Sequence, residues 1–504
     1  MTTDPVALQV LVGAMRAACE EMGAVLIRSA HSSNIKERRD CSTALFDPAG
    51  QMVAQAEHIP VHLGAMPAAV AAVLDEEHAP GRSWILNDPY RGGTHLPDIT
   101  VITPVFERDE GDGGALLGFA ASRAHHADVG ARVPGSMPAD SRTLSEEGVV
   151  IPPRTLDEAT ITELVGQMRN PDQRRADLRA QVAAGLTGIR RLREIAARLG
   201  TDALARGMED VLDYGERRAR ACLRALPDGT WTSVDVLEGA DGDLELRLRA
   251  TVDGDRIVLD FTGSAEQDPG NLNCPLAVTR SACVFAVKVL TDPDIPPSAG
   301  AHRPIEVIAP EGSVLNARPP AAVAAGNVET SSRVADLVLH AFGRAHGQGT
   351  MNNLTLGNDA FTYYETLGGG QGACPDAPGP SAVHVAMSNT RNTPVEALEL
   401  EFPLRVTKYA IRRDSGGTGR HRGGDGVVRE LEALEPMTAS LITERRRHAP
   451  RGVEGGADGA RGRNVLNGTE LPPKWTGDLA EGDRLRLETP GGGGHGAPET
   501  PHSG

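Results

Sequence analysis

The sequence has few lysines and lacks the phosphate-binding loop that depends on one. Only four of the 51 basic residues are lysine, and none of the four follows a glycine, so the Walker-type GK dipeptide is absent. The GxSxG motif of a nucleophile elbow is absent too. If the protein uses a nucleotide, this chain is therefore not expected to bind it through a familiar loop.

Cysteine pairs and long apolar runs are also missing. The six cysteines include no CxxC pair and have no regular spacing. The N-terminus shows no basic segment followed by an apolar one, so we expect a reduced, cytoplasmic protein. No segment approaches the roughly 18 uninterrupted apolar residues of a membrane span. Even the apolar stretch 275–290 contains Arg280 and Lys288, so no membrane partner is expected.

Acidic residues outnumber basic ones. The formal net charge is −17, from 68 acidic and 51 basic residues, which argues against nucleic acid or an anionic membrane as the main partner. The 40% hydrophobic and 24% charged contents are typical of globular proteins. Because 504 residues exceed one ordinary hydrophobic core, two or three domains are expected.

Hydrophobic periodicity and turn residues predict an α+β protein with several domains. Residues 1–154 are expected to form a mixed α/β part that carries the candidate site. Residues 155–228 alternate charged residues with Leu and Ala at helical spacing and are expected to form long helices. Residues 229–504, rich in glycine and proline, are expected to be mostly β.

Local signals place individual elements within these parts. Asp4 and Pro5 are a typical helix start, and residues 47–50 (Asp-Pro-Ala-Gly) are a typical hairpin turn. Further helices are predicted at 64–77 and 328–344. Strands are predicted at 83–90, 98–106, 115–126, 229–263 (as alternating strands), 383–390, 404–411 and 484–490. The closing GGGGHGAPETPHSG is expected to be flexible from its composition, although its glycines permit close backbone approach.

The clearest constellation for chemistry lies in "NDPYRGGTHLPDIT" (87–100) and "SRAHHADVG" (122–130). His95 and Asp98 lie three apart on a loop, and His125 and His126 end the next predicted strand. Imidazole and carboxylate together suit Zn, Mn or Fe, and three protein ligands leave a position open for water. Asp40 is a further candidate ligand. The alternative is a hydrogen-bonded polar core that orders the hairpin.

Other stretches point less clearly to a site. His58 and His62 lie four apart, but Pro60 between them favours an extended loop over a helix face. "GNVETSSR" (326–333) offers four candidate site residues ahead of a predicted helix, although an N-terminal capping arrangement is favoured: Asn327, Glu329, Thr330 and Arg333. Glu365 precedes a glycine run that permits close approach to a ligand, although a bulged turn is more common. Three arginines of "RRDSGGTGRHRGGDG" offer an anion site, with a solvated basic loop as the default: Arg412, Arg413 and Arg420.

Several sequence motifs, spread along nearly the whole chain, resemble those of one family. They are "NIKERRDCSTALFD", "VAQAEHIPVHLGAMP", "ILNDPYRGGTHLPDIT", "SRAHHADVGARVPGSMP", "GNVETSSRV", "MSNTRNTPVE" and "TPGGGGHG". Together they look like the hydantoinase B/oxoprolinase family, from about residue 4 to 497.

The resemblance implies one component of an ATP-dependent, hetero-oligomeric enzyme. A hydantoinase A-type partner binds ATP and phosphorylates the carbonyl oxygen of a cyclic amide such as a hydantoin, 5-oxoproline or a lactam. The B-type chain then opens the ring with a metal-bound water. The alternatives are a component of an acetone- or acetophenone-type ketone carboxylase, and a non-catalytic scaffold. The missing GK dipeptide agrees with ATP being the partner's ligand.

The same resemblance implies roles for individual residues. The metal ligands fall on His95, Asp98 and His125, with Asp40 close by. Asp40 and His126 are the candidates for general base or proton donor. His126 and Asp128 are also candidates for orienting the ligands.

Overall fold

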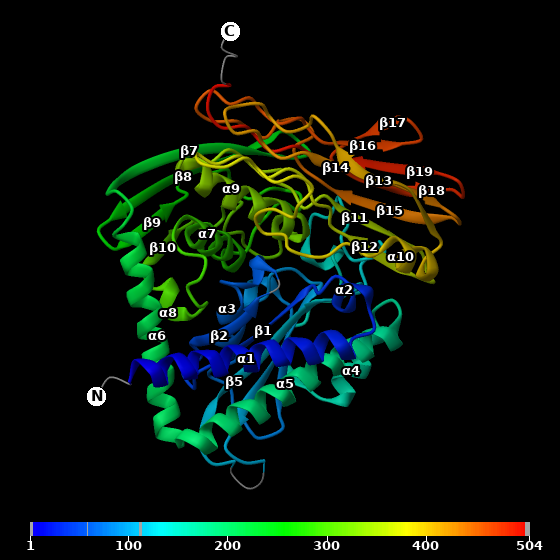
Figure 1. Cartoon of the computed structure of the whole chain (residues 1–504). Helices are drawn as coiled ribbons and strands as arrows, with labels where there is room; N and C mark the ends of the chain where they lie inside the picture. The colour runs from blue at the N-terminus through cyan, green and yellow to red at the C-terminus, as the bar shows by residue number, and fades with distance from the viewer. Residues whose placement is uncertain (1–3, 58, 110–112, 499–504) are drawn as a thin grey trace.

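The structure, a computed structural model, describes residues 4–57, 59–109 and 113–498 and has the predicted α+β architecture (Figure 1). The N-terminal part is built on a six-stranded sheet in the order β2-β1-β5-β4-β3-β6, in which every neighbouring pair is antiparallel. Its strands are β1 (Cys41–Phe46), β2 (Met52–Glu57), β3 (Ser83–Leu86), β4 (Asp98–Phe106), β5 (Leu116–His125) and β6 (Arg154–Leu156). The predicted 47–50 turn joins β1 to β2.

Long helices cover one face of this sheet (Figure 1). Asp4 caps the first of them by accepting the Ala7 N–H, and Pro5 opens it, as predicted. One hydrophobic cluster contains residues of α1, α5 and α6 together with residues of β1, β2 and β5, so the helical segment shares a core with the N-terminal sheet. The helices are α1 (Pro5–Ser29), α4 (Glu158–Val165), α5 (Pro171–Leu199) and α6 (Thr201–Leu223).

Short elements cover the opposite face. A helix was predicted at 64–77, and α3 (Met66–Ala71) is the shorter helix found there. Its Met66 and Val70 pack against Phe119 of β5 and Ile102 of β4. The other short elements of this part are α2 (Ser33–Lys36), η1 (Pro60–His62), η2 (Pro89–Arg91) and η3 (Leu144–Glu146).

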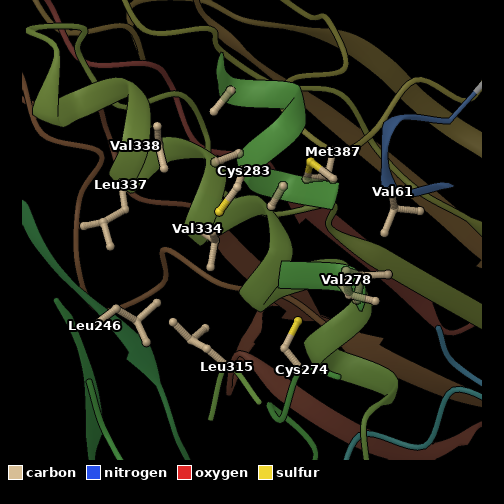
Figure 2. Packing of buried hydrophobic residues seen from close by; sticks show 14 of the residues in the cluster. Val61, Leu246, Cys274, Val278, Cys283, Leu315, Val334, Leu337, Val338 and Met387 are labelled. Atoms are coloured by element: carbon tan, nitrogen blue, oxygen red, sulfur yellow. The ribbon is translucent and has the colours of Figure 1, made fainter. Parts of the chain in front are cut away.

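The middle of the molecule holds the largest hydrophobic cluster (Figure 2). Two helices pack there against a four-stranded sheet in the order β10-β9-β8-β7. Val61 of η1 and Met387 of a distant loop belong to the same cluster. The elements are β7 (Gly229–Glu238), β8 (Asp243–Asp253), β9 (Arg256–Asp260), α7 (Leu276–Leu290), α8 (Ala299–His302), β10 (Ile305–Ile308), η4 (Gly326–Thr330) and α9 (Ser331–Ala341).

Two further sheets form the C-terminal part, in the orders β12-β11-β15-β18 and β13-β14-β19-β16-β17. The strands predicted at 404–411 and 484–490 are found as β13 and β19. The prediction of a strand at 383–390 is wrong, because that segment is irregular. The elements are β11 (Asn353–Gly357), β12 (Thr362–Glu365), α10 (Val395–Glu401), β13 (Leu404–Arg412), β14 (Gly426–Ala433), β15 (Met437–Ile442), β16 (Arg463–Leu466), β17 (Thr469–Leu471), β18 (Lys474–Leu479) and β19 (Arg484–Glu488).

Glycine-rich segments pack directly on one another beside these sheets. Gly492 N–H donates to the Gly424 carbonyl at 2.9 Å, and Gly370 N–H donates to Pro490 at 3.0 Å. A Cβ on Gly370 would lie 2.0 Å from the Gly424 oxygen. The flexibility predicted for the tetraglycine is therefore wrong for 491–496, which are buried. The segments are ordered because their backbones pack closely and satisfy one another's hydrogen bonds.

Across the described ranges, no helix combines the length and apolar character needed to cross a bilayer.

Candidate metal centre

Strand pairing brings the three predicted ligand residues together. Asp98 opens β4 and lies directly opposite His125, the last residue of β5. Because side chains alternate along a strand, both face the α3 side of the sheet, as Ile102 and Phe119 do. His95 lies three residues before Asp98 on the preceding loop. One nitrogen or oxygen atom from each of these three buried residues lies within 4.8 Å of the other two.

Asp98 is the centre of a group of imidazoles. Its Oδ2 lies 3.0 Å from His95 Nδ1 and 3.4 Å from His62 Nε2, and its Oδ1 lies 3.5 Å from His125 Nδ1. Burial would raise the pKa of Asp98, but the surrounding histidines hold it well below its ordinary value. Burial also lowers the pKa of His125. At neutral pH the arrangement therefore offers an ionised carboxylate beside a neutral His125 imidazole.

Two of these nitrogen atoms are buried without a partner. Within the part of the chain that the structure describes, this holds for Nε2 of His95 and Nε2 of His125, whereas His95 Nδ1 and His62 Nε2 face Asp98. Buried polar atoms are normally satisfied, so two unpartnered nitrogens beside one carboxylate indicate a group that binds there. Imidazole nitrogen and carboxylate oxygen are the ligands that Zn, Mn or Fe accepts, so these residues fit a divalent cation.

The loop before Asp98 is held in shape by its own polar residues. Asn87 donates to the Leu96 carbonyl at 2.8 Å and accepts the Ile151 N–H at 2.6 Å. Asp88 accepts the Tyr90 N–H at 3.0 Å and caps η2. A Cβ at Gly93 would lie 2.2 Å from the Asn87 oxygen, so only glycine fits there. These contacts present His95 and Asp98 from a rigid support.

A small cavity lies against this group. Its volume is about 20 Å³, room for about one water molecule or ion. Asp40 lines it and accepts the His125 N–H through its backbone carbonyl at 3.0 Å. The lining residues are Asp40, Ile59, Val61, His62, His95, Asp98, His125, Asn327, Val328, Met351, Tyr364, Thr366, Ser388 and Thr390.

His126 and Asp128 lie outside this lining. His126 follows His125 and faces the helix side of the sheet, where its Nε2 lies 2.9 Å from Gln181 Oε1 of α5. Asp128 accepts the N–H groups of Gly130 and Gly135 and pairs with Arg169, 3.1 Å away. Its contacts order the turn that follows β5.

His62 is a site residue that the sequence did not single out as a ligand. Pro60 favoured an extended loop there, but 60–62 form the 3-10 turn η1, which buries His62 completely. Its Nδ1 lies 2.9 Å from Ser42 Oγ, which turns Nε2 toward Asp98. His58, named together with it, lies outside the described residues.

The wall opposite the strands comes from the C-terminal part. The Tyr364 ring stacks on His125 with 4.5 Å between ring centroids and an 11° angle between the planes. The Arg38 guanidinium carbon lies 4.6 Å from the Tyr364 ring centroid. The Tyr364 hydroxyl donates to Asn353 Oδ1 at 2.6 Å. No local signal marks Tyr364, because its partners are distant in the sequence.

The capping interpretation of 326–333 is wrong, because those side chains make long-range contacts instead of capping α9. Asn327 lines the cavity. Glu329 accepts the N–H of Met351 and the side-chain amide of Asn353, both at 3.2 Å. Arg333 pairs with Asp235 and Glu444, which lie outside this segment.

The other two stretches that the sequence singled out lie away from the cavity lining. Glu365 is buried and pairs with Arg429 at 3.4 Å. Arg412 donates to backbone carbonyls and pairs with Glu488, whereas Arg413 and Arg420 are exposed, as in a solvated loop.

Comparison with known proteins shows which family the chain belongs to. The family model described as "Hydantoinase B/oxoprolinase" matches residues 4–498. The chain belongs to the hydantoinase B/oxoprolinase family. This confirms the resemblance that the sequence motifs indicated.

Two relatives show how the chain compares in length with other family members. It is 40% identical to 5-oxoprolinase 1 of Arabidopsis thaliana over 98% of its own length but only 42% of that protein. It is 29% identical to a putative D-/L-hydantoinase component from Pseudomonas sp. (strain NS671), covering 98% of this chain and 90% of that one. The chain thus spans about two fifths of the 5-oxoprolinase and nearly all of the hydantoinase component.

A solved structure shares the whole fold. The crystal structure of the ATP-dependent caprolactamase from Pseudomonas jessenii superposes with a TM-score of 0.91 at 27% identity, covering 99% of this chain and 92% of that one. The likeness therefore includes the sheet that carries Asp98 and His125 and the C-terminal part that carries Tyr364.

Proposed function

We propose that the chain is the B-type component of an ATP-dependent cyclic amidohydrolase that opens its ring at the cavity beside Asp98. The observation that carries the proposal is the buried group of His95, Asp98 and His125, which lines one small cavity and leaves Nε2 of both histidines without a partner. A catalytic rather than purely structural role is supported by Asp40 and His62, which line the same space.

The substrate class is supported by what the relatives' names share. Oxoproline, hydantoin and caprolactam are all cyclic amides. An amide carbon resists attack because the nitrogen donates electrons into the carbonyl. Phosphorylation of the carbonyl oxygen makes the carbon electrophilic, which accounts for the use of ATP. A hydantoinase A-type partner would supply the ATP site, since this chain lacks the GK dipeptide of a Walker-type loop.

A divalent cation, Zn, Mn or Fe, would be held by His95, Asp98 and His125, with His62 as a further ligand. When bound, such a cation supplies Lewis-acid polarisation and makes water acidic enough to act near neutral pH. Thr94 donates to Asp98 Oδ2 at 2.7 Å and fixes the carboxylate for this task.

The chain's own residues would control protons and water. Asp40 is the general base of the proposal, because it is a carboxylate residue that lines the cavity together with His125. His126, on the other face of the sheet, would act only by supporting the strand end. A cyclic amide is larger than the roughly 20 Å³ cavity, so one wall has to move outward when the substrate enters.

The charges around the cavity favour an anionic substrate once a cation is bound. Two buried carboxylates, Asp40 and Asp98, are balanced by two buried guanidinium groups, Arg38 and Arg123. Burial lowers the pKa of Arg123 only to about 10, so it remains charged at neutral pH. A divalent cation then leaves two positive charges in excess, and a phosphoryl dianion neutralises them.

The test is ATP hydrolysis by this chain assembled with an A-type partner. We expect turnover that a cyclic amide stimulates without bicarbonate, and that Asp98→Ala abolishes while the complex still assembles. Stimulation only by a ketone with bicarbonate would instead identify a carboxylase. Activity unaffected by both His95→Ala and Asp98→Ala would show that this chain is a scaffold.

A further inference from the structure

Two threonine hydroxyls on the cavity wall are held by one buried arginine. Thr366 Oγ1 and Thr390 Oγ1 lie 2.6 Å apart, and Arg38 Nη2 donates to them at 3.0 and 3.3 Å. Both threonines line the cavity, and all three side chains are buried. Arg38 is also fixed by its Nη1, which donates to the Tyr364 carbonyl at 3.0 Å.

One of the two hydroxyl protons of the threonine pair has no acceptor within the pair. Both oxygens accept from Arg38, and between the two hydroxyls one must donate to the other. The hydroxyl that accepts still has its own proton, because each hydroxyl carries one donor. The described residues provide no acceptor for this second proton beyond the pair itself. The free donor therefore belongs to a group that lines the cavity.

This donor is stronger than an isolated hydroxyl. The guanidinium withdraws electron density from both oxygens, and chains of hydrogen bonds polarise one another in a low dielectric. Arg38 is fully buried, and its nearest carboxylate, Asp40, is 4.0 Å away. An anionic oxygen nearby would stabilise a buried guanidinium charge that is so loosely paired.

We infer that the Thr366–Thr390 pair, polarised by Arg38, forms a binding site for an anionic phosphoryl oxygen of the activated cyclic amide. This inference rests on the proposed function, because it places the phosphorylated substrate between the hydroxyl pair and the histidine–aspartate group. The cavity of about 20 Å³ has room for about one atom, so the phosphoryl oxygen reaches the hydroxyl pair as the cavity widens to admit the substrate. Ser388, another hydroxyl residue of this wall, has its Oγ 2.6 Å from His384 Nδ1 and is already partnered.

The test measures the affinity of the full-length chain for inorganic phosphate by calorimetry, with metal content measured on the same samples. We expect Thr366→Val and Thr390→Val each to weaken phosphate binding about tenfold or more, since a hydrogen bond to a charged acceptor is worth about 1.5–3 kcal/mol. Thr366→Ser keeps the hydroxyl and should bind like the wild type.

Thr393→Val is the matched control on the same segment. Thr393 is 2% exposed, its hydroxyl has no hydrogen-bond partner, and it is not part of the cavity wall. This variant should bind phosphate normally, and thermal melting shows whether each variant is folded. In the complex with an A-type partner, the two valine variants should also raise the phosphate concentration needed for product inhibition.

The outcomes separate this inference from the proposed function. If folded Thr366→Val and Thr390→Val chains retain metal and bind phosphate like the wild type, the inference is wrong while the proposed function stands. If the wild type binds no phosphate, the inference is also wrong. A wild-type chain without metal contradicts the proposed function, whereas the effect of the valine substitutions on phosphate affinity still decides the role of the hydroxyl pair.

Discussion

His125 and His126 are neighbours in the chain but serve opposite faces of one sheet. The alternation of side chains along β5 points His125 at Asp98 and His126 at Gln181 of α5. The pair thereby connects the cavity to the helix layer: one imidazole contributes to the candidate metal group, and the other anchors the strand end. A shift of β5 by one residue would exchange these positions, so the register with β4 sets the geometry of the site.

Tyr364 is expected to hold the His125 ring in its ligand orientation. Residues that orient metal ligands typically contribute about 10- to 100-fold to metal affinity. Tyr364→Leu removes the stacked ring and should weaken metal binding by about that factor, measured by competition with a chelator. Tyr364→Phe keeps the ring and loses only the hydrogen bond to Asn353, so its affinity should stay near the wild-type value. Equal losses in both variants would show that the hydroxyl, not the stacking, matters.

Glu329 gives the folded protein a defined pH dependence. Burial, with Glu444 nearby, raises the pKa of Glu329 from 4.5 to about 8. Between these values the folded chain holds a proton that the unfolded chain has lost, so this contribution is complete below 4.5 and disappears as the pH rises through 8. The glutamine side chain in Glu329→Gln is neutral at every pH, so this variant does not lose that stability as the pH rises.

The measurement is the melting temperature of both proteins from about pH 5 to about pH 9. The melting temperature of the variant should rise relative to that of the wild type as the pH increases over this window. Parallel profiles would mean that Glu329 titrates normally in the folded protein.

At the scale of elements, local signals predicted most of the N-terminal part, although the helix predicted at 64–77 is only α3 (Met66–Ala71). Capping by Asp4, the 47–50 turn and the strands ending at His125 depend on neighbours in the sequence, and all were found. The failures depend on distant contacts. Residues 383–390 have the composition of a strand, yet the segment is irregular, with Met387 packed in the central cluster and Ser388 on the cavity wall. Composition contains no information about such partners.

The glycine-rich segments provide a sharp test at this scale. A Cβ at Gly492 would lie 2.0 Å from the Gln371 carbonyl oxygen, which is backbone and cannot turn aside. Gly492→Ala should therefore lower stability by several kcal/mol (about 3 or more), as overpacking of a rigid contact does. The measurement is the shift in thermal or urea unfolding.

Gly13 is the control for the glycine test. It lies within α1, and a Cβ there meets no atom within 4 Å. Gly13→Ala should raise stability by about 0.5–1 kcal/mol, because alanine loses less conformational entropy in a helix. A Gly492→Ala chain as stable as the wild type would show that the glycine segments can separate without loss.

At the scale of the whole molecule, the cavity exists only because distant parts of the chain meet. Asp40, His95, Asp98 and His125 come from the N-terminal part and were identified from the sequence, through residue chemistry and family resemblance. Tyr364 and its neighbours come from the C-terminal part and were not. Their polar side chains lie in segments without a characteristic spacing, so only the fold reveals that they face the histidines.

The most direct measurement is the metal content of this chain by mass spectrometry, for the wild type, Asp98→Ala, His125→Ala and His126→Ala. We expect about one Zn, Mn or Fe per chain in the wild type. Both Asp98→Ala and His125→Ala should lose it while remaining folded, and His126→Ala should keep it, because His126 faces α5. A wild type without metal, or metal retained in both cavity variants, would contradict the assignment of this cavity as the metal centre of the amidohydrolase.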